Sequence, residues 1–66
     1  MTYFLFSDHG TWHREVAATT WREALRQARA EFGIGGRLRI CHINYESRDY
    51  HLDGTGYTFS LRKVTS

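Results

Sequence analysis

The sequence has no proline and only one cysteine, Cys41. Because it also lacks any Gly/Ser-rich stretch, no linker is indicated, and we expect residues 1–66 to form a single domain. A lone cysteine excludes an intramolecular disulfide. A reduced, intracellular setting is the simpler expectation, with Cys41 buried as a small hydrophobic side chain in preference to acting as a reactive thiol.

Long hydrophobic runs are missing as well. The first six residues carry no positive side chain and have only four consecutive apolar positions, 3–6, which is too short for a signal peptide. No stretch approaches the roughly 18 apolar residues of a membrane span. We therefore expect a soluble, cytoplasmic protein without a membrane partner. Lysine is scarce too, and the net charge of +2 indicates solubility more than a particular partner.

Aromatic side chains are what the chain has in abundance, with two Trp, four Tyr and four Phe. A domain of this size buries only about 60% of the surface that its unfolded chain exposes. Each large ring buries roughly 150–250 Å². We expect these rings to supply most of a thin core.

The order of patterns along the chain predicts an α+β fold. A capping box, Thr20 to Glu23, starts a helix whose apolar positions recur at 21, 25, 28 and 32, and Gly33 ends it. Alternating or aromatic-rich segments predict strands at 2–7, 11–17, 37–45, 50–52 and 57–64, with turns at 8–10, 46–49 and 53–56. The expected architecture is a single amphipathic helix packed on a mostly antiparallel four- to five-stranded sheet, in the order ββαβββ.

Both faces of this predicted sheet carry apolar residues. Alternation places Phe4 and Phe6 on one face of the first strand, and it separates Leu38 and Ile40 from Cys41, Ile43 and Tyr45 on the third. A helix of twelve residues, roughly 18 Å long, covers one face only. We therefore expect a partner on the other face, with Phe4, Phe6 and Tyr45 among the contacts. The alternative is that sheet twist, or long Arg and Tyr side chains, buries the second face.

Arginines form a second candidate surface on the helix. Arg22, Arg26 and Arg29 are spaced i, i+4 and i+7 and make a narrow arginine stripe beside the apolar one. Arg37 and Arg39 on the third strand extend it. The opposite flank of the helix carries Glu23, Gln27 and Glu31. The stripe suits an anion, either an acidic protein surface or a phosphate backbone, although an ordinary solvated helix face has the same pattern.

The four histidines do not form a recognisable site. His9 and His13 lie in a turn and a strand, and the adjacent Cys41 and His42 point to opposite faces, so we expect no metal and no cofactor. His13, His42, His51, Tyr57 and the arginines are the residue types of a small ribonuclease, but their spacing predicts no convergence. We expect a protein that is not an enzyme.

A compact, proline-free chain of this length without a catalytic motif resembles, in size and type, the small phage-encoded inhibitors of bacterial defence systems, including anti-CRISPR proteins. The resemblance implies a protein that docks one face on a large nucleoprotein effector complex in the bacterial cytoplasm and blocks it sterically. The residues themselves favour a non-catalytic protein-binding module. The alternatives are a small nucleic-acid-binding domain and a small ribonuclease, and a homodimer would also cover the second face.

Overall fold

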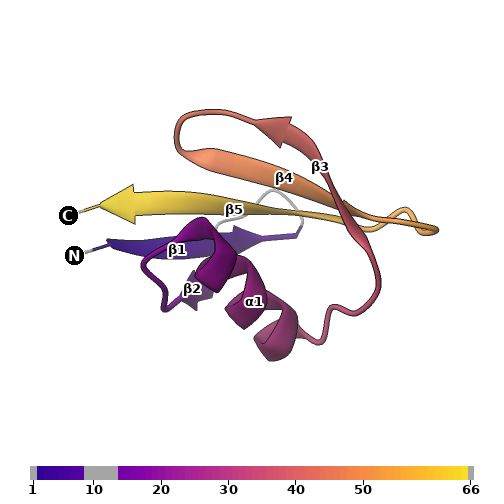
Figure 1. The fold of residues 1–66 in the computed structure, drawn as a ribbon, viewed down its shortest axis with the longest axis horizontal. Coiled ribbons are helices and arrows are strands. Elements are labelled where there is room, and N and C mark those ends of the chain that lie inside the picture. Colours follow the sequence, from indigo (N-terminus) through magenta and orange to yellow (C-terminus); the bar gives the residue numbers. More distant parts are fainter. Residues whose placement is uncertain (1, 9–13, 66) are drawn as a thin grey trace.

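A computed structural model describes residues 2–8 and 14–65 of the chain. The elements are β1 (Thr2–Ser7), β2 (Arg14–Val16), α1 (Trp21–Phe32), β3 (Leu38–Ile43), β4 (Ser47–Leu52) and β5 (Thr58–Thr65). The five strands form one antiparallel sheet in the order β2-β1-β5-β4-β3, with the helix on one face (Figure 1). The predicted α+β architecture, in the order ββαβββ, is confirmed. Within the described ranges no helix combines the length and apolar character that crossing a membrane requires.

The helix begins and ends at the predicted residues. The Thr20 hydroxyl accepts a hydrogen bond from the Glu23 amide at 3.1 Å, which satisfies one of the free amides of the first turn. Gly33 ends the helix with φ 66°, a left-handed conformation that glycine adopts without steric cost. The Glu23 carboxylate does not reach back as in a full capping box, since it accepts from Arg26 and Gln27 instead.

Aromatic side chains run across the sheet through its core. Phe6 on β1 stacks on Phe32 of the helix, with ring centroids 4.0 Å apart, and on Phe59 of β5 at 5.4 Å. Phe59 in turn stacks on Tyr50 of β4 at 5.2 Å. This aromatic row, consisting of Phe32, Phe6, Phe59 and Tyr50, connects the helix to three adjacent strands. The remaining core residues are Phe4, Val16, Ala24, Ala28, Ile34 and Leu61.

The β3–β4 hairpin turns earlier than the sequence pattern predicts. The Asn44 side-chain oxygen accepts hydrogen bonds from the amides of Glu46 and Ser47 and from the Ser47 hydroxyl, at 2.9–3.1 Å. The chain therefore reverses over residues 44–47, and β4 starts at Ser47. The predicted turn at 46–49 was wrong, because an asparagine side chain that bonds the backbone ahead of it stabilises a turn at its own position.

A β-bulge at Cys41 changes the faces of β3. Ile40 pairs with Tyr50, but the next pair is His42 with Asp49, so Cys41 is an extra residue on its strand. An extra residue shifts the alternation by one. Ile43, opposite Arg48, consequently joins Ile40 on the helix side of the sheet. The prediction that Ile43 faces away from Ile40 was wrong for this reason.

Candidate functional site

The helix covers only one end of the sheet. Trp21 and Phe32 pack on Phe4 and Phe6, which both belong to β1. Figure 1 shows α1 lying beside β1 and β2, away from β3. The sheet therefore continues beyond the helix on the same face, through β4 to β3.

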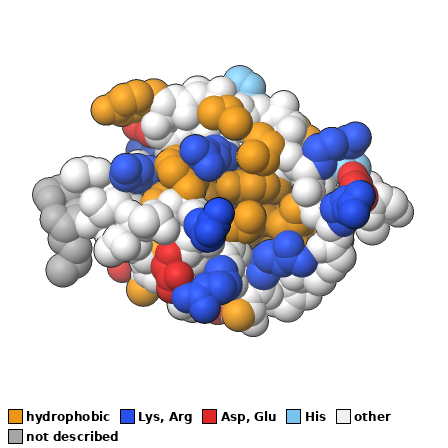
Figure 2. All heavy atoms as spheres, viewed as in Figure 1, with side chains coloured by type: hydrophobic (Ala, Val, Ile, Leu, Met, Phe, Trp, Pro, Cys, Tyr) orange, Lys and Arg blue, Asp and Glu red, His pale blue; other side chains and the backbone are white. Residues whose placement is uncertain are grey.

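Three large apolar side chains are exposed at this uncovered end. Ile40, Ile43 and Tyr45 are 46%, 57% and 97% exposed, and we call them the β3 patch. Ile40 lies opposite Tyr50, the last ring of the aromatic row, so the patch continues the core outward to the sheet edge. Figure 2 shows apolar side chains gathered at the centre of the helix-side face, with Lys and Arg side chains around them. Apolar surface that emerges from a core in this way is typical of a binding site.

The arginine stripe of the helix borders this uncovered region. Glu31 on the opposite flank lies 3.8 Å from Arg14 of β2, so that flank is directed towards the β2 edge. The arginine flank is then directed towards β4 and β3. Arg29 donates a hydrogen bond to the carbonyl of Gly36, in the loop that leads into β3, at 2.5 Å. The structure thus brings together the arginine stripe and the exposed apolar residues on one face.

A further arginine, which the sequence pattern did not single out, lies between the helix and the sheet. Arg48 of β4 lies opposite Ile43, and its guanidinium carbon is 4.6 Å from the centroid of the Trp21 ring. This is a cation–π contact. Only the tertiary fold could reveal it, since Trp21 and Arg48 are far apart in the sequence.

The arginines that the sequence pattern singled out differ in how they are engaged. Arg26 bonds the Glu23 carboxylate at 2.5 Å, and this hydrogen bond, with a second from Gln27, lowers the pKa of Glu23. Arg39 pairs with His51 and lies on the opposite, polar side of β3, so it does not extend the arginine stripe as predicted. Its guanidinium lies 3.4 Å from His51 Nδ1 and 3.9 Å from the Asp53 carboxylate. Exposed ion pairs of this kind contribute little to stability, so a partner carboxylate can replace them. Arg22 and Arg37 are exposed and have no ion pair within the described part of the chain.

Two of the predicted partner contacts, Phe4 and Phe6, are in the core. They are 0% and 2% exposed, because the helix packs on the face of β1 that they share. The expectation that they line an exposed surface was wrong. Tyr45, by contrast, is exposed as expected.

The second face of the sheet is not the apolar surface that the sequence pattern predicts. Tyr3 and Leu5 on that face are half-buried, and most of the other residues that the register places there are polar. These polar residues include Glu15, Arg62, Ser60, Asp49, His51 and Arg39. The exposed side chains of Ile40 and Ile43 lie on the helix side instead. The single helix is indeed too small for its sheet, but the area that it leaves uncovered is on the face of the sheet on which it packs.

Cys41 is a free cysteine with an exposed side chain, so the prediction that it is buried was wrong. It is the extra residue of the bulge on an edge strand, where nothing in the described chain packs over it. Its position depends on how β3 pairs with β4, which the local sequence does not indicate.

The residues of the ribonuclease hypothesis are only partly brought together. His42 and His51 lie on the same polar face of neighbouring strands; His42 is directly opposite Asp49, and His51 is two residues beyond Asp49 on β4. Tyr57 lies apart from them, and burial together with the charge and hydrogen bond of Asp8 raises its pKa. His9 and His13 are outside the described residues. Among the described His, Cys, Asp and Glu side chains, no group of three is placed to hold a metal ion.

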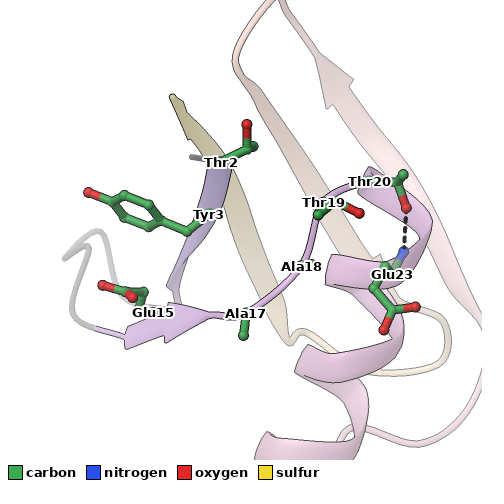
Figure 3. A pocket seen from close by; sticks show the side chains of 8 residues that line it. All are labelled: Thr2, Tyr3, Glu15, Ala17, Ala18, Thr19, Thr20 and Glu23. Atoms are coloured by element: carbon green, nitrogen blue, oxygen red, sulfur yellow. Dashed lines mark hydrogen bonds between the residues drawn. The ribbon is translucent and has the colours of Figure 1, made fainter. Parts of the chain in front are cut away.

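An open hollow lies where β1 and β2 meet the segment that enters α1 (Figure 3). Tyr3 and Glu15 project from the strands, whereas Thr19 and Thr20 belong to the segment before the helix. The interaction drawn within the hollow is the Thr20 cap of the helix, and the Glu23 carboxylate is held by Arg26. The Thr20 hydroxyl and the Glu23 carboxylate are therefore both engaged in contacts of the helix itself.

Comparisons with known proteins do not assign the chain to a family. No protein-family model, no curated protein and no solved structure gives a significant match. The feature that indicates a function is the β3 patch with the arginines around it.

Proposed function

We propose that the protein is a non-catalytic protein-binding module that docks through the β3 patch and through the arginines beside it on the helix side, which we call the arginine border: Arg22, Arg26, Arg29 and Arg48. The observation that carries this proposal is the joint exposure of Ile40, Ile43 and Tyr45 beside a core that the helix leaves open. An apolar centre within a polar rim is the common anatomy of protein interfaces. Tyr and Arg are among the residue types that contribute most to binding energy at such interfaces.

The charge of the border favours an acidic partner. Arg22 of the arginine stripe is exposed and has no ion pair within the described residues, and the chain as a whole carries +2. Complementary charge around an apolar centre increases the association rate and selects against basic partners. In its most specific form the proposal is an anti-CRISPR-like inhibitor, which would cover an acidic surface of a bacterial defence effector complex. That form is supported only by the size and type of the chain.

A nucleic-acid-binding domain is the second candidate, since the same arginines suit phosphates. Proteins of this kind usually offer several exposed rings on which bases stack. In the β3 patch the exposed ring is Tyr45, and one face of Trp21 is already occupied by Arg48. The patch is otherwise aliphatic, which favours a protein partner.

Capture of a partner from bacterial lysate tests the proposal. The immobilised protein is compared with Ile43→Lys, in the β3 patch, and with Ala30→Lys, on the outer face of the helix. Both substitutions add one positive charge at an exposed position. We expect Ile43→Lys to lose the captured protein and Ala30→Lys to keep it. An unchanged profile for Ile43→Lys would remove the patch from the interface, and capture of no protein would contradict the proposal.

Binding to duplex and single-stranded oligonucleotides at low and high salt separates the two candidates. A protein that neutralises phosphates binds at low salt and loses affinity steeply as salt rises. We expect no binding at either salt concentration. Tight, salt-sensitive binding would replace the proposed function with the nucleic-acid alternative.

A further inference from the structure

The outer edge of β3 carries unpaired backbone groups. β3 is the last strand of the sheet, and β4 pairs with one of its two edges. The Asp53 amide donates to the Arg37 carbonyl at 2.9 Å, which makes this a hydrogen-bonded pair. Hydrogen-bonded and non-hydrogen-bonded pairs alternate along an antiparallel ladder, so the N–H and C=O groups of Leu38 and Ile40 point away from β4. Within the described residues no strand pairs with this edge.

We propose that an extended segment of the partner protein adds to this edge as a sixth strand beside β3. This inference rests on the proposed function and names the part of the surface that makes the contact. The side chains of β3 then specify the sequence of the added strand. Those of Leu38 and Ile40 lie on the helix side, and those of Arg37 and Arg39 lie on the polar side. The matching segment alternates apolar residues on the helix side with acidic residues on the polar side.

Charge argues against a second copy of this chain as the added strand. Antiparallel self-pairing centred on Leu38 places Arg37 opposite Arg39 of the other copy, and pairing centred on Arg39 places two arginines opposite each other. Like charges directly opposite across two strands are destabilising. Pairing centred on Ile40 runs through the Cys41 bulge in both copies, where the ladder is disrupted. Charges and bulges are common devices that keep an edge strand from pairing with its own kind.

Amide hydrogen exchange with defined peptides tests strand addition. The probes are two hexapeptides, one alternating valine with glutamate and the other alternating valine with lysine. We expect the glutamate peptide to slow exchange of the Leu38 and Ile40 amides by about tenfold or more, and the lysine peptide to leave it unchanged. A glutamate peptide methylated on the amide nitrogens that would face β3 should lose the protection, because it cannot donate to the outward carbonyls.

A charge-reversal variant tests the same contact through the preference between the two peptides, which does not depend on how tightly either peptide binds. Arg37→Glu combined with Arg39→Glu should exchange the preference, so that the lysine peptide binds about tenfold more tightly than the glutamate peptide. Arg14→Glu combined with Lys63→Glu is the matched control, with the same change in charge at exposed positions of β2 and β5, away from β3. It should retain the preference for glutamate. Equal protection by both peptides, or protection by neither, would overturn the inference.

The outcome for strand addition is separable from that for the proposed function. If a protein is captured through Ile43 while the Leu38 and Ile40 amides of the complex exchange as in the free protein, the module function stands and strand addition is wrong. If no protein is captured either, the proposed function and strand addition are both wrong. Protection of these two amides in the captured complex would support both.

Discussion

At the scale of single residues, Phe59 is a buried side chain on which stability is expected to depend strongly. Its side chain is 1% exposed, stacks on Phe6 and Tyr50, and lies against Tyr57. Replacing a buried phenylalanine with alanine removes transfer free energy and leaves a cavity, at a cost of about 3–5 kcal/mol. We predict a loss of this size in the free energy of unfolding of Phe59→Ala, measured by urea denaturation followed by circular dichroism. Ile43→Ala, at an exposed position, should lose less than about 1 kcal/mol. Similar losses for the two variants would contradict this description of the core.

Tyr50 makes the stability depend on pH in the alkaline range. Burial raises the pKa of its phenol above the ordinary value of 10.0, while the charge of Arg48 and its hydrogen bond act in the opposite direction with smaller effect. A raised pKa in the folded state means that the folded protein holds this proton more tightly than the unfolded chain. The resulting stability is fully present below pH 10.0 and is lost as pH rises through the folded-state pKa.

We therefore predict that Tyr50→Phe loses less thermal stability than the unsubstituted protein when the pH is raised from about 9 to about 11. The measurement is the difference in Tm between the two pH values. Tyr45→Phe removes an exposed phenol and should behave like the unsubstituted protein. A Tyr50→Phe variant that loses as much stability as Tyr45→Phe would show that the buried phenol is not responsible.

At the scale of elements, the bulge in β3 allows a sharp test. Because Cys41 is the extra residue, its deletion should leave Ile40 and Ile43 on the helix side and produce a regular ladder with β4. We predict that the deletion variant folds, with a free energy of unfolding within about 1 kcal/mol of the original. It should also self-associate more readily, because a flat edge pairs more easily than a bulged one. Denaturation and sedimentation equilibrium measure the two effects, and an unfolded variant would contradict the assigned register.

The same elements show how far the sequence could predict the structure. The helix could be predicted to the residue, because Thr20 and Gly33 act through local backbone geometry. Strand alternation assigned Phe4 and Phe6 to a shared face but could not indicate that the helix would pack on it. The arginine stripe followed from spacing alone, whereas its direction towards β3 depends on the contact between Glu31 and a distant strand. The turn at 44–47 has a local signal in Asn44, which strand alternation alone does not detect.

At the scale of the whole molecule, stability is distributed unevenly across the sheet. β5 lies at its centre between β1 and β4, whereas β3 pairs with β4 alone and is largely exposed. Regions with few buried contacts open locally at lower free energy than the core. We predict that the Arg39 amide of β3 exchanges at least about tenfold faster than the Leu61 amide of β5 in native-state hydrogen exchange. Equal protection of the two amides would indicate that β3 opens only when the whole domain unfolds.

The central position of β1 and β5 also determines how the fold would respond to force. Thr2 lies opposite Thr65, so the two described chain ends meet at the same end of one antiparallel pair (Figure 1). Tension applied between the ends would pull β1 and β5 apart from one end. The hydrogen bonds of this pair would then be loaded one after another, whereas in shear they would be loaded all at once. The first pair to yield is in the middle of the sheet, between β2-β1 on one side and β5-β4-β3 on the other. A molecule held together by this core is therefore expected to be mechanically compliant along the line joining its ends.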